Sequence, residues 1–81
     1  MLNVEFKSDE VSDFHLKISQ NIKRIRKQAG ITQLNLAVGI GINSSGSYSD
    51  YENNKNSKKF NLNYLYKIAK VLEVDVCEFF I

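Results

Sequence analysis

The sequence predicts an all-α fold of five helices joined by short loops. Apolar residues recur at spacings of three and four along most of the chain, which is the period of a helix with one buried face. Glycines and polar runs rich in Asn and Ser separate these stretches, and such residues cap or end helices. The 81 residues suffice for one domain and are too few for two.

The first residues have a different pattern. Residues 2–7 alternate apolar and polar side chains, which is the period of a half-buried strand. Six residues cannot form a stable sheet alone, so we expect a short arm, or a strand that pairs with another chain. We assign residues 1–15 to this arm and a helix extension, and residues 16–81 to the domain itself.

A long helix is expected over residues 10–29, either continuous or interrupted near Ser19. Ser8 or Asp9 is suited to cap its start, and Gly30 stands where a C-terminal cap is expected. Its apolar positions form one continuous stripe: Val11, Phe14, Ile18, Ile22, Ile25 and Ala29.

Two shorter helices should follow. The second begins after Thr32, a good N-cap residue, and ends before Gly41, which tolerates a left-handed turn. The polar run of residues 43–47 offers caps for a third helix that ends near Asn53.

The last two helices follow a basic connection. Asn61 is suited to cap a fourth helix, whose apolar stripe is Leu62, Leu65, Ile68, Ala69 and Leu72. A fifth, short helix should start at Val74 and Asp75.

Composition excludes several classes of protein. No apolar run approaches the ~18 residues of a membrane span, and the acidic start lacks a signal-peptide core, so we expect a soluble, cytoplasmic protein. One cysteine, Cys77, and one histidine, His15, predict no disulfide and no metal site. No cofactor or catalytic motif is present either, so we expect that the protein is not an enzyme and needs no cofactor.

The charges are unevenly distributed. Residues 1–16 carry a net charge of −3, residues 17–60 carry +6 and residues 61–81 carry −1. A basic middle between acidic ends suits a polyanion-binding centre, and ordinary surface charge is the alternative.

Several separated features, none specific alone, occur in one order: NIKRIRKQAGITQ at 21–33, LA at 36–37, Gly41, SDYE at 49–52, LYKIAKVL at 65–72 and VDVCEFF at 74–80. Together they make residues 18–80 resemble the Cro and phage-repressor (XRE) type of helix-turn-helix regulator. The segment YSDYENNKNSKK with its leucine-rich helix looks closest to restriction–modification controller proteins. The resemblance implies a five-helix lambda-repressor-like DNA-binding domain with its motif at about residues 32–52.

In such a motif the second helix lies in the DNA major groove while the first crosses the backbone. Ala37 matches the small residue where the helices touch, and Gly41 matches the turn. The resemblance further implies a structural pair between Arg26 and Glu52, for which two independent surface charges are the alternative reading.

The resemblance also indicates which residues face double-stranded DNA. They lie at the start of the second helix, in and just before the third helix, and in the loop after the third helix. They are Thr32, Gln33, Asn43, Ser44, Ser45, Ser47, Ser49, Asp50, Asn53, Asn54 and Lys55.

The third helix departs from the family pattern. The spacing from Ala37 to Glu52 is one residue longer than usual, and the helix has no Arg, Gln or Lys to read guanine or adenine. Asp50 would repel phosphates or accept a hydrogen bond from a cytosine amine. Weak base discrimination, or readout of DNA shape, is therefore expected.

The leading hypothesis is a transcriptional regulator, a repressor or controller, that binds a two-fold operator as a homodimer without an evident small-molecule effector. The expected dimer surface is Val76, Phe79, Phe80 and Ile81, with the N-terminal arm as second choice. The alternative is a helix-turn-helix module used for protein contact, of antitoxin or anti-repressor type. Tyr48 is expected in the core, and Cys77 is expected to be partly buried.

Overall fold

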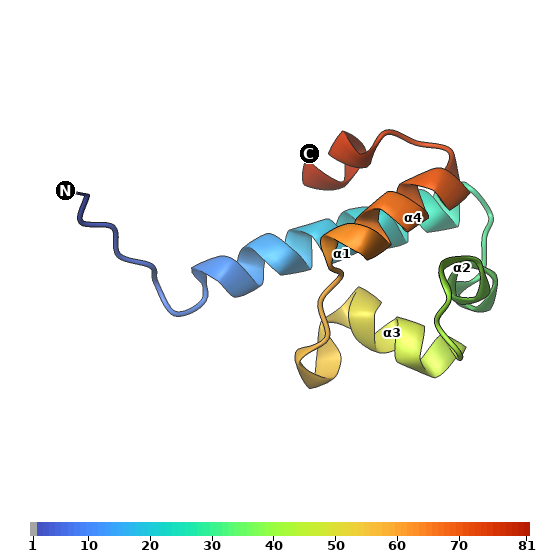
Figure 1. The fold of residues 1–81 in the computed structure, drawn as a ribbon, viewed down its shortest axis with the longest axis horizontal. Helices are drawn as coiled ribbons and strands as arrows, with labels where there is room; N and C mark the ends of the chain where they lie inside the picture. The colour runs from blue at the N-terminus through green and yellow to red at the C-terminus, as the bar shows by residue number, and fades with distance from the viewer. Residues whose placement is uncertain (1) are drawn as a thin grey trace.

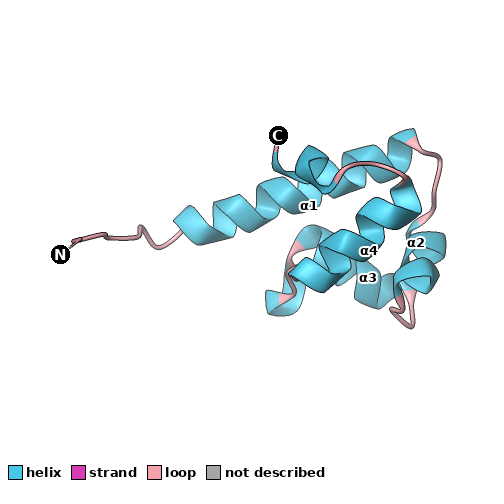
Figure 2. Ribbon diagram, turned by 45° about the horizontal axis from the view of Figure 1, so that its top comes forward, coloured by secondary structure: helices cyan, strands magenta, loops and turns pink. Residues whose placement is uncertain are grey.

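Four α-helices and two 3₁₀ helices make up the regular structure of residues 2–81, which are the residues that the computed structural model describes (Figure 1). In chain order they are α1 (Glu10–Gln28), α2 (Gln33–Ile40), α3 (Ser45–Asn53), η1 (Lys55–Ser57), α4 (Leu62–Leu72) and η2 (Val76–Phe80). Figure 2 shows helices and loops and no strand over this part of the chain. The fold is all-helical.

The other elements are arranged around the long helix α1. It runs unbroken past Ser19, and its second half packs against α3 on one side and against η2 on the other (Figure 1). The helices α2 and α3 pack against each other, and α4 covers α2. Asn21 of α1 fixes η2 in place, because its amide donates to the carbonyl oxygens of Phe79 and Ile81 at 2.9 and 3.0 Å.

The predicted caps are confirmed at three helix starts. Thr32 Oγ1 accepts from the Asn35 N–H at 3.1 Å, Ser44 Oγ from the Ser47 N–H at 3.1 Å, and Asn61 Oδ1 from the Tyr64 N–H at 2.8 Å. Each bond satisfies a backbone donor that has no partner inside its helix. These short polar side chains therefore set where α2, α3 and α4 begin.

One apolar core joins all four α-helices and η2. Its most buried large side chains are Tyr48, Phe79, Ile22, Leu36, Ile40 and Ile68. The prediction that Tyr48 belongs to the core is confirmed, since its side chain is fully buried and its ring lies 5.8 Å from that of Phe60.

The predicted fifth, short helix is present as η2, but it is a five-residue 3₁₀ helix, so the count of five α-helices is not confirmed. Asp75 accepts from the Cys77 N–H at 3.0 Å, and the Glu78 N–H donates to the Asp75 carbonyl at 3.0 Å. The first bond is a side-chain cap, and the second, a backbone bond over three residues, winds the segment more tightly than an α-helix. The helix points Cys77 outward, so this side chain is exposed and not partly buried.

The start of the chain also differs from the sequence prediction. Residues 2–7 have no regular structure, and this segment forms no strand in the described single chain. The apolar stripe of α1 is likewise buried only in its middle, since Val11, Phe14 and Ala29 are exposed. The body of the domain covers the stripe from Ile18 to Ile25 and leaves both ends bare.

Candidate nucleic-acid interface

The turn between α2 and α3 is a tight, glycine-dependent connection. Gly41 ends α2 in the left-handed region at φ 85°, which a side chain would disfavour. The Ile42 N–H then donates to the Ala37 carbonyl oxygen at 2.8 Å, and the Ile42 side chain is buried. This anchor fixes the angle at which the chain leaves α2, and Ser44 caps α3 two residues later.

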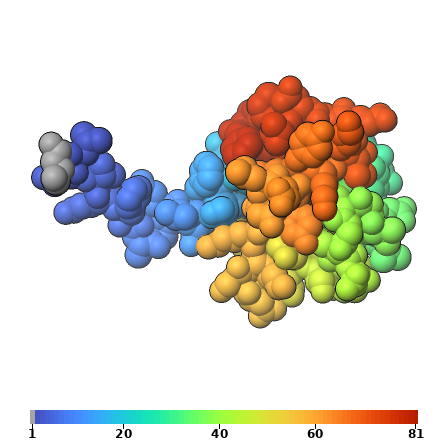
Figure 3. All heavy atoms as spheres, viewed as in Figure 1, coloured from blue at the N-terminus to red at the C-terminus, as the bar shows by residue number. Residues whose placement is uncertain are grey.

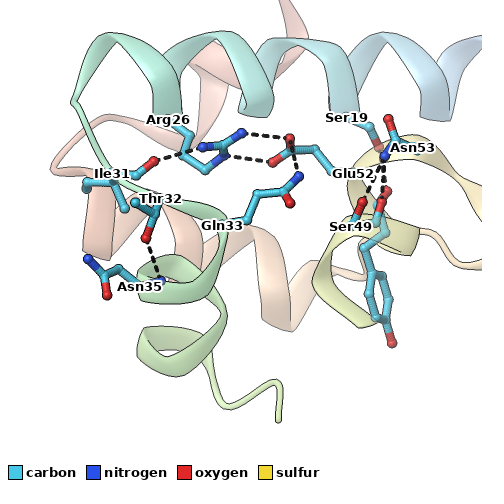
Figure 4. A network of polar contacts seen from close by, with 10 residues as sticks. Ser19, Arg26, Ile31, Thr32, Gln33, Asn35, Ser49, Glu52 and Asn53 are labelled. Atoms are coloured by element: carbon cyan, nitrogen blue, oxygen red, sulfur yellow. Dashed lines mark hydrogen bonds and ion pairs between the residues drawn. The ribbon is translucent and has the colours of Figure 1, made fainter. Parts of the chain in front are cut away.

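A buried ion pair joins α3 to α1 (Figure 4). Arg26 Nε and Nη2 donate to the two carboxylate oxygens of Glu52, both at 3.0 Å, and both side chains are buried. Arg26 Nη1 donates to the Ile31 carbonyl at 2.8 Å, and Gln33 Nε2 donates to Glu52 Oε1 at 3.3 Å. The Arg26–Glu52 pair thereby connects α1 and α3 with the loop before α2, through Arg26, and with the first turn of α2, through Glu52.

The charges of this network stabilise each other. Burial opposes ionisation of Glu52, but hydrogen bonds, first of all from Arg26, outweigh it and hold the pKa of the Glu52 carboxyl below its ordinary value. The hydrogen bond from Arg26 to Glu52 likewise raises the pKa of the Arg26 guanidinium. Both groups are therefore charged over the whole neutral range.

The Tyr48 hydroxyl lies beside this pair. Among the described residues it has no hydrogen-bond partner of good geometry, although it is fully buried. Burial, and next to it the neighbouring Glu52 carboxylate, raise the pKa of Tyr48 far above its ordinary value. The phenol therefore stays protonated at every physiological pH.

The first three residues of α3 are exposed. Ser45, Gly46 and Ser47 are exposed, as is Asn43 in the turn before them. Their small polar side chains leave the backbone of the helix start accessible, and nothing lies within 3.4 Å of where a Cβ on Gly46 would stand. This face of α3 can therefore approach a ligand surface closely.

A family model described as helix-turn-helix matches residues 22–79. The chain belongs to the helix-turn-helix family, in its Cro and phage-repressor type. No curated protein matches the chain. The matched region runs from the buried half of α1 to η2, and it contains every buried apolar residue of the core except Ile18.

This helix-turn-helix protein is thus a member of a family of DNA-binding transcription regulators. In the motif, α2 corresponds to the helix that crosses the DNA backbone and α3 to the recognition helix. Among residues 2–81, no helix has the length and apolar character to cross a membrane. Within the same range, no three side chains of metal-binding type come together.

The structure separates the sequence-predicted DNA contacts into two groups. Exposed side chains on or near α3 are Asn43, Ser45, Ser47, Asn53 and Lys55, with Thr32 at the start of α2. Ser44 is exposed as well, but its hydroxyl oxygen is used as the α3 cap. Ser49 and Asp50 are half-buried on the flank of α3.

Three of the predicted contacts donate to other groups of the protein. The Asn53 amide donates to the carbonyl and hydroxyl oxygens of Ser49 at 3.0 and 3.1 Å, within α3. Gln33 donates to Glu52 and so belongs to the buried network. The Asn54 amide donates to Ser19 Oγ and to the Tyr51 carbonyl, both at 2.9 Å, which ties the end of α3 to α1. In this arrangement the amides of Gln33, Asn53 and Asn54 are bonded to protein acceptors.

Sequence reasoning missed Asn56, whose amide Nδ2 donates to Asp50 Oδ2 at 3.1 Å. Asn54, Asn56 and Ser57 all have positive φ, between 53° and 58°, so the chain turns sharply after α3. The run of asparagines was the available signal, because Asn tolerates the left-handed region better than most residues. The turn leaves Lys55, Lys58 and Lys59 exposed.

Proposed function

We propose that this helix-turn-helix protein is a cytoplasmic, sequence-specific transcriptional regulator, a repressor or a controller of restriction–modification type. It binds a two-fold operator as a homodimer, with one half-site for each subunit. The observation that carries the proposal is the exposed start of α3, which the Gly41 turn and the Arg26–Glu52 pair hold in a fixed orientation. Residues 16–81 form the DNA-binding domain, and residues 1–15 form an arm and a helix extension.

Base contacts in this proposal come from the exposed side chains around the start of α3. Asn43 is suited to an adenine, and the hydroxyls of Ser45 and Ser47 can donate to or accept from any base edge. Hydroxyls discriminate weakly between bases, so part of the sequence preference comes from the shape of the DNA.

Phosphate contacts come from both ends of the motif. The first turn of α2, capped by Thr32, presents backbone N–H groups and the positive end of a helix dipole. Asn53, the last residue of α3, and Lys55 beyond it are exposed and reach the neighbouring stretch of DNA backbone. Lys58 and Lys59 follow closely in the chain. Because Asp50 shares this side of α3 and is bonded to Asn56, its charge limits the affinity.

The homodimer uses the apolar C-terminal surface that the sequence suggested, with one change. Val76, Phe80 and Ile81 are exposed and available to a partner. Phe79 is fully buried against the protein's own core, so it supports this surface from beneath and does not belong to it.

The test is DNA binding measured by fluorescence anisotropy from about 50 to about 200 mM salt. The probes are duplexes from just upstream of the protein's own gene and a scrambled duplex of equal length. We expect preference for the upstream DNA and an affinity that falls steeply with salt. Lys55→Ala should lower the magnitude of the log–log slope by about 0.9, and Lys70→Ala, on α4, should leave it unchanged. No salt-dependent binding to any duplex would overturn the proposal.

The second candidate function is a helix-turn-helix module that contacts a protein, as in an antitoxin or anti-repressor. The observation in its favour is an α3 surface that carries hydroxyls and one carboxylate and no basic side chain. If it is correct, the double replacement Ser47→Ala and Lys55→Ala, at two exposed residues, leaves the biological activity intact. The DNA-binding function instead predicts a loss of regulation from the same variant.

A further inference from the structure

The first two turns of α1 project from the body of the molecule. Figure 3 shows the start of the chain and the beginning of α1 standing away from the rest of the domain. Over residues 10–17 only His15 is partly buried. These turns extend a helix that is packed only in its second half, and most helical stability in proteins comes from the packing of an apolar face. A packing partner for this segment is therefore expected.

The projecting segment continues the apolar stripe of the core. Phe14 precedes Ile18, Ile22 and Ile25 at spacings of four, four and three, and these three isoleucines are buried. The Phe14 ring lies 6.3 Å from the ring of Phe80, which η2 brings to the same side of α1. We call Val11, Phe14 and Phe80 the Phe14 patch. Its two phenylalanines are 55% and 44% exposed, which leaves about 200 Å² of aromatic surface open.

We propose that a second copy of this chain covers the Phe14 patch by packing its own α1 antiparallel to the first. The two-fold axis passes at Phe14, perpendicular to both helices. The patch of one copy then meets the identical patch of the other, as an isologous interface requires. Phe80 contributes to this contact from η2, which extends it into the C-terminal surface.

Charge complementarity favours a second copy over an unrelated partner. Glu10 and Lys17 lie four residues before and three residues after Phe14, which places both on one flank of the stripe. In an antiparallel pair of helices this flank faces the same flank of the partner, so Glu10 meets the partner's Lys17 and Lys17 meets the partner's Glu10. The symmetric arrangement therefore forms two opposite-charge pairs without any other molecule.

A parallel arrangement fails on the same residues. In parallel pairs the position opposite Lys17 lies five residues further along the partner, which is Ile22. Ile22 is fully buried in its own domain and cannot be reached. The two helices must therefore run in opposite directions.

The antiparallel pair also gives a spacing suited to DNA, and this step rests on the proposed function. Arg26, which holds α3 through Glu52, lies twelve residues after Phe14, or about 18 Å along the helix. With one such length of helix on each side of the two-fold axis, the Arg26 residues of the two copies lie about 36 Å apart. Adjacent half-sites on one face of B-DNA lie about 34–36 Å apart.

The proposal is tested by the dimer dissociation constant from sedimentation velocity, without DNA. We expect Lys17→Glu and Glu10→Lys each to weaken the dimer about tenfold, because each turns two attractive pairs into repulsive ones. The double variant restores attraction and should return to within about threefold of the wild type. Glu10 Oε2 also accepts from the Lys7 N–H at 3.2 Å, so Glu10→Lys alone frays the helix start, and the double variant separates the two effects.

Phe14→Glu should abolish the dimer, and Leu62→Glu, an exposed apolar site on α4, should leave it unchanged. Circular dichroism checks that every variant is folded. A monomeric wild type, a Phe14→Glu variant that still dimerises, or a double charge variant without rescue would each overturn the interface. Loss of DNA binding with an intact dimer would instead count against the proposed function, so the two failures are distinguishable.

Discussion

The Glu52 carboxylate of α3 and the Arg26 guanidinium of α1 face each other through two parallel hydrogen bonds of 3.0 Å, in a site closed to solvent. Bidentate geometry of this kind fixes direction as well as distance. A buried pair adds little net stability, because the loss of hydration offsets much of the attraction. Its main effect here is to set the orientation of the recognition helix relative to α1.

Breaking the pair on one side should be costly. Glu52→Gln keeps the shape of the side chain but leaves a buried guanidinium without a counter-charge, so we expect a loss of about 3 kcal/mol in the free energy of unfolding. Urea unfolding followed by circular dichroism measures it. Glu78→Gln, an exposed control, should change stability by less than about 0.5 kcal/mol. A loss below about 1 kcal/mol at position 52 would contradict a buried, paired carboxylate.

The same carboxylate should make stability depend on pH. The pKa of Glu52 is lower in the folded protein than its ordinary value of 4.5, so the unfolded chain takes up the proton more readily. This contribution is complete above about pH 5.5 and is lost as the pH falls below 4.5 toward the folded pKa. Unfolding curves between pH 3 and pH 7 should show this loss in the wild type. Glu52→Gln should show a shallower dependence, and an equal slope in both proteins would refute the linkage.

Most helix boundaries could be predicted from the sequence, because they depend on residues that act within a few positions of themselves. Thr32, Ser44 and Asn61 act as caps through bonds to residues three positions ahead, so their effect needs no knowledge of tertiary structure. Gly41 is similarly diagnostic of its turn. The exposure of the two ends of the apolar stripe of α1 could not be predicted. Whether Phe14 is covered depends on where α1 extends beyond the body of the domain, which is a matter of tertiary structure.

The residues available to contact DNA were harder to predict from the sequence than the fold. Gln33 and Asn54 are polar and stand where the family pattern places DNA contacts, but each has a protein acceptor within 3.3 Å. Periodicity identifies the face of a helix and does not say which long polar side chain turns back to a neighbour. Phe79 and Phe80 are adjacent in the sequence, but the orientation of η2 places Phe79 in the core and Phe80 on the surface.

Removing the Tyr48 hydroxyl should stabilise the protein. The hydroxyl is buried without a well-placed partner, and such a group forfeits its hydration for no compensating bond. We expect Tyr48→Phe to raise the free energy of unfolding by about 1 kcal/mol, since the ring and its packing on Phe60 are retained. Tyr66→Phe, at an exposed tyrosine, is the control and should be neutral. Destabilisation by Tyr48→Phe would mean that the hydroxyl bonds to the ion pair in solution.

Two glycines of the motif should respond oppositely to alanine. Gly41 holds φ at 85°, so Gly41→Ala strains the turn and should cost about 1 kcal/mol. Gly46 lies in the first turn of α3, where an added Cβ would lie 3.9 Å from Ser44 Oγ, an ordinary contact, so Gly46→Ala should add about 0.5 kcal/mol through helix propensity. Thermal unfolding of the two variants gives the comparison. Equal effects of the same sign would show that the turn conformation does not matter.

The acidic residue on the recognition helix should limit affinity for DNA. Asp50 lies half-buried on α3, and its Oδ2 accepts from the Asn56 amide, which holds the negative charge beside the turn that carries Lys55. Asp50→Asn retains an oxygen that can accept from Asn56 and removes the charge. We therefore expect binding to operator and scrambled duplexes to tighten together, by about three- to tenfold at low salt and less at high salt. Glu78→Gln on η2 removes the same charge elsewhere on the molecule and should have a smaller effect. If Asp50→Asn instead weakens binding to the operator alone, the carboxylate reads a base, and a cytosine amine is the group that it would accept from.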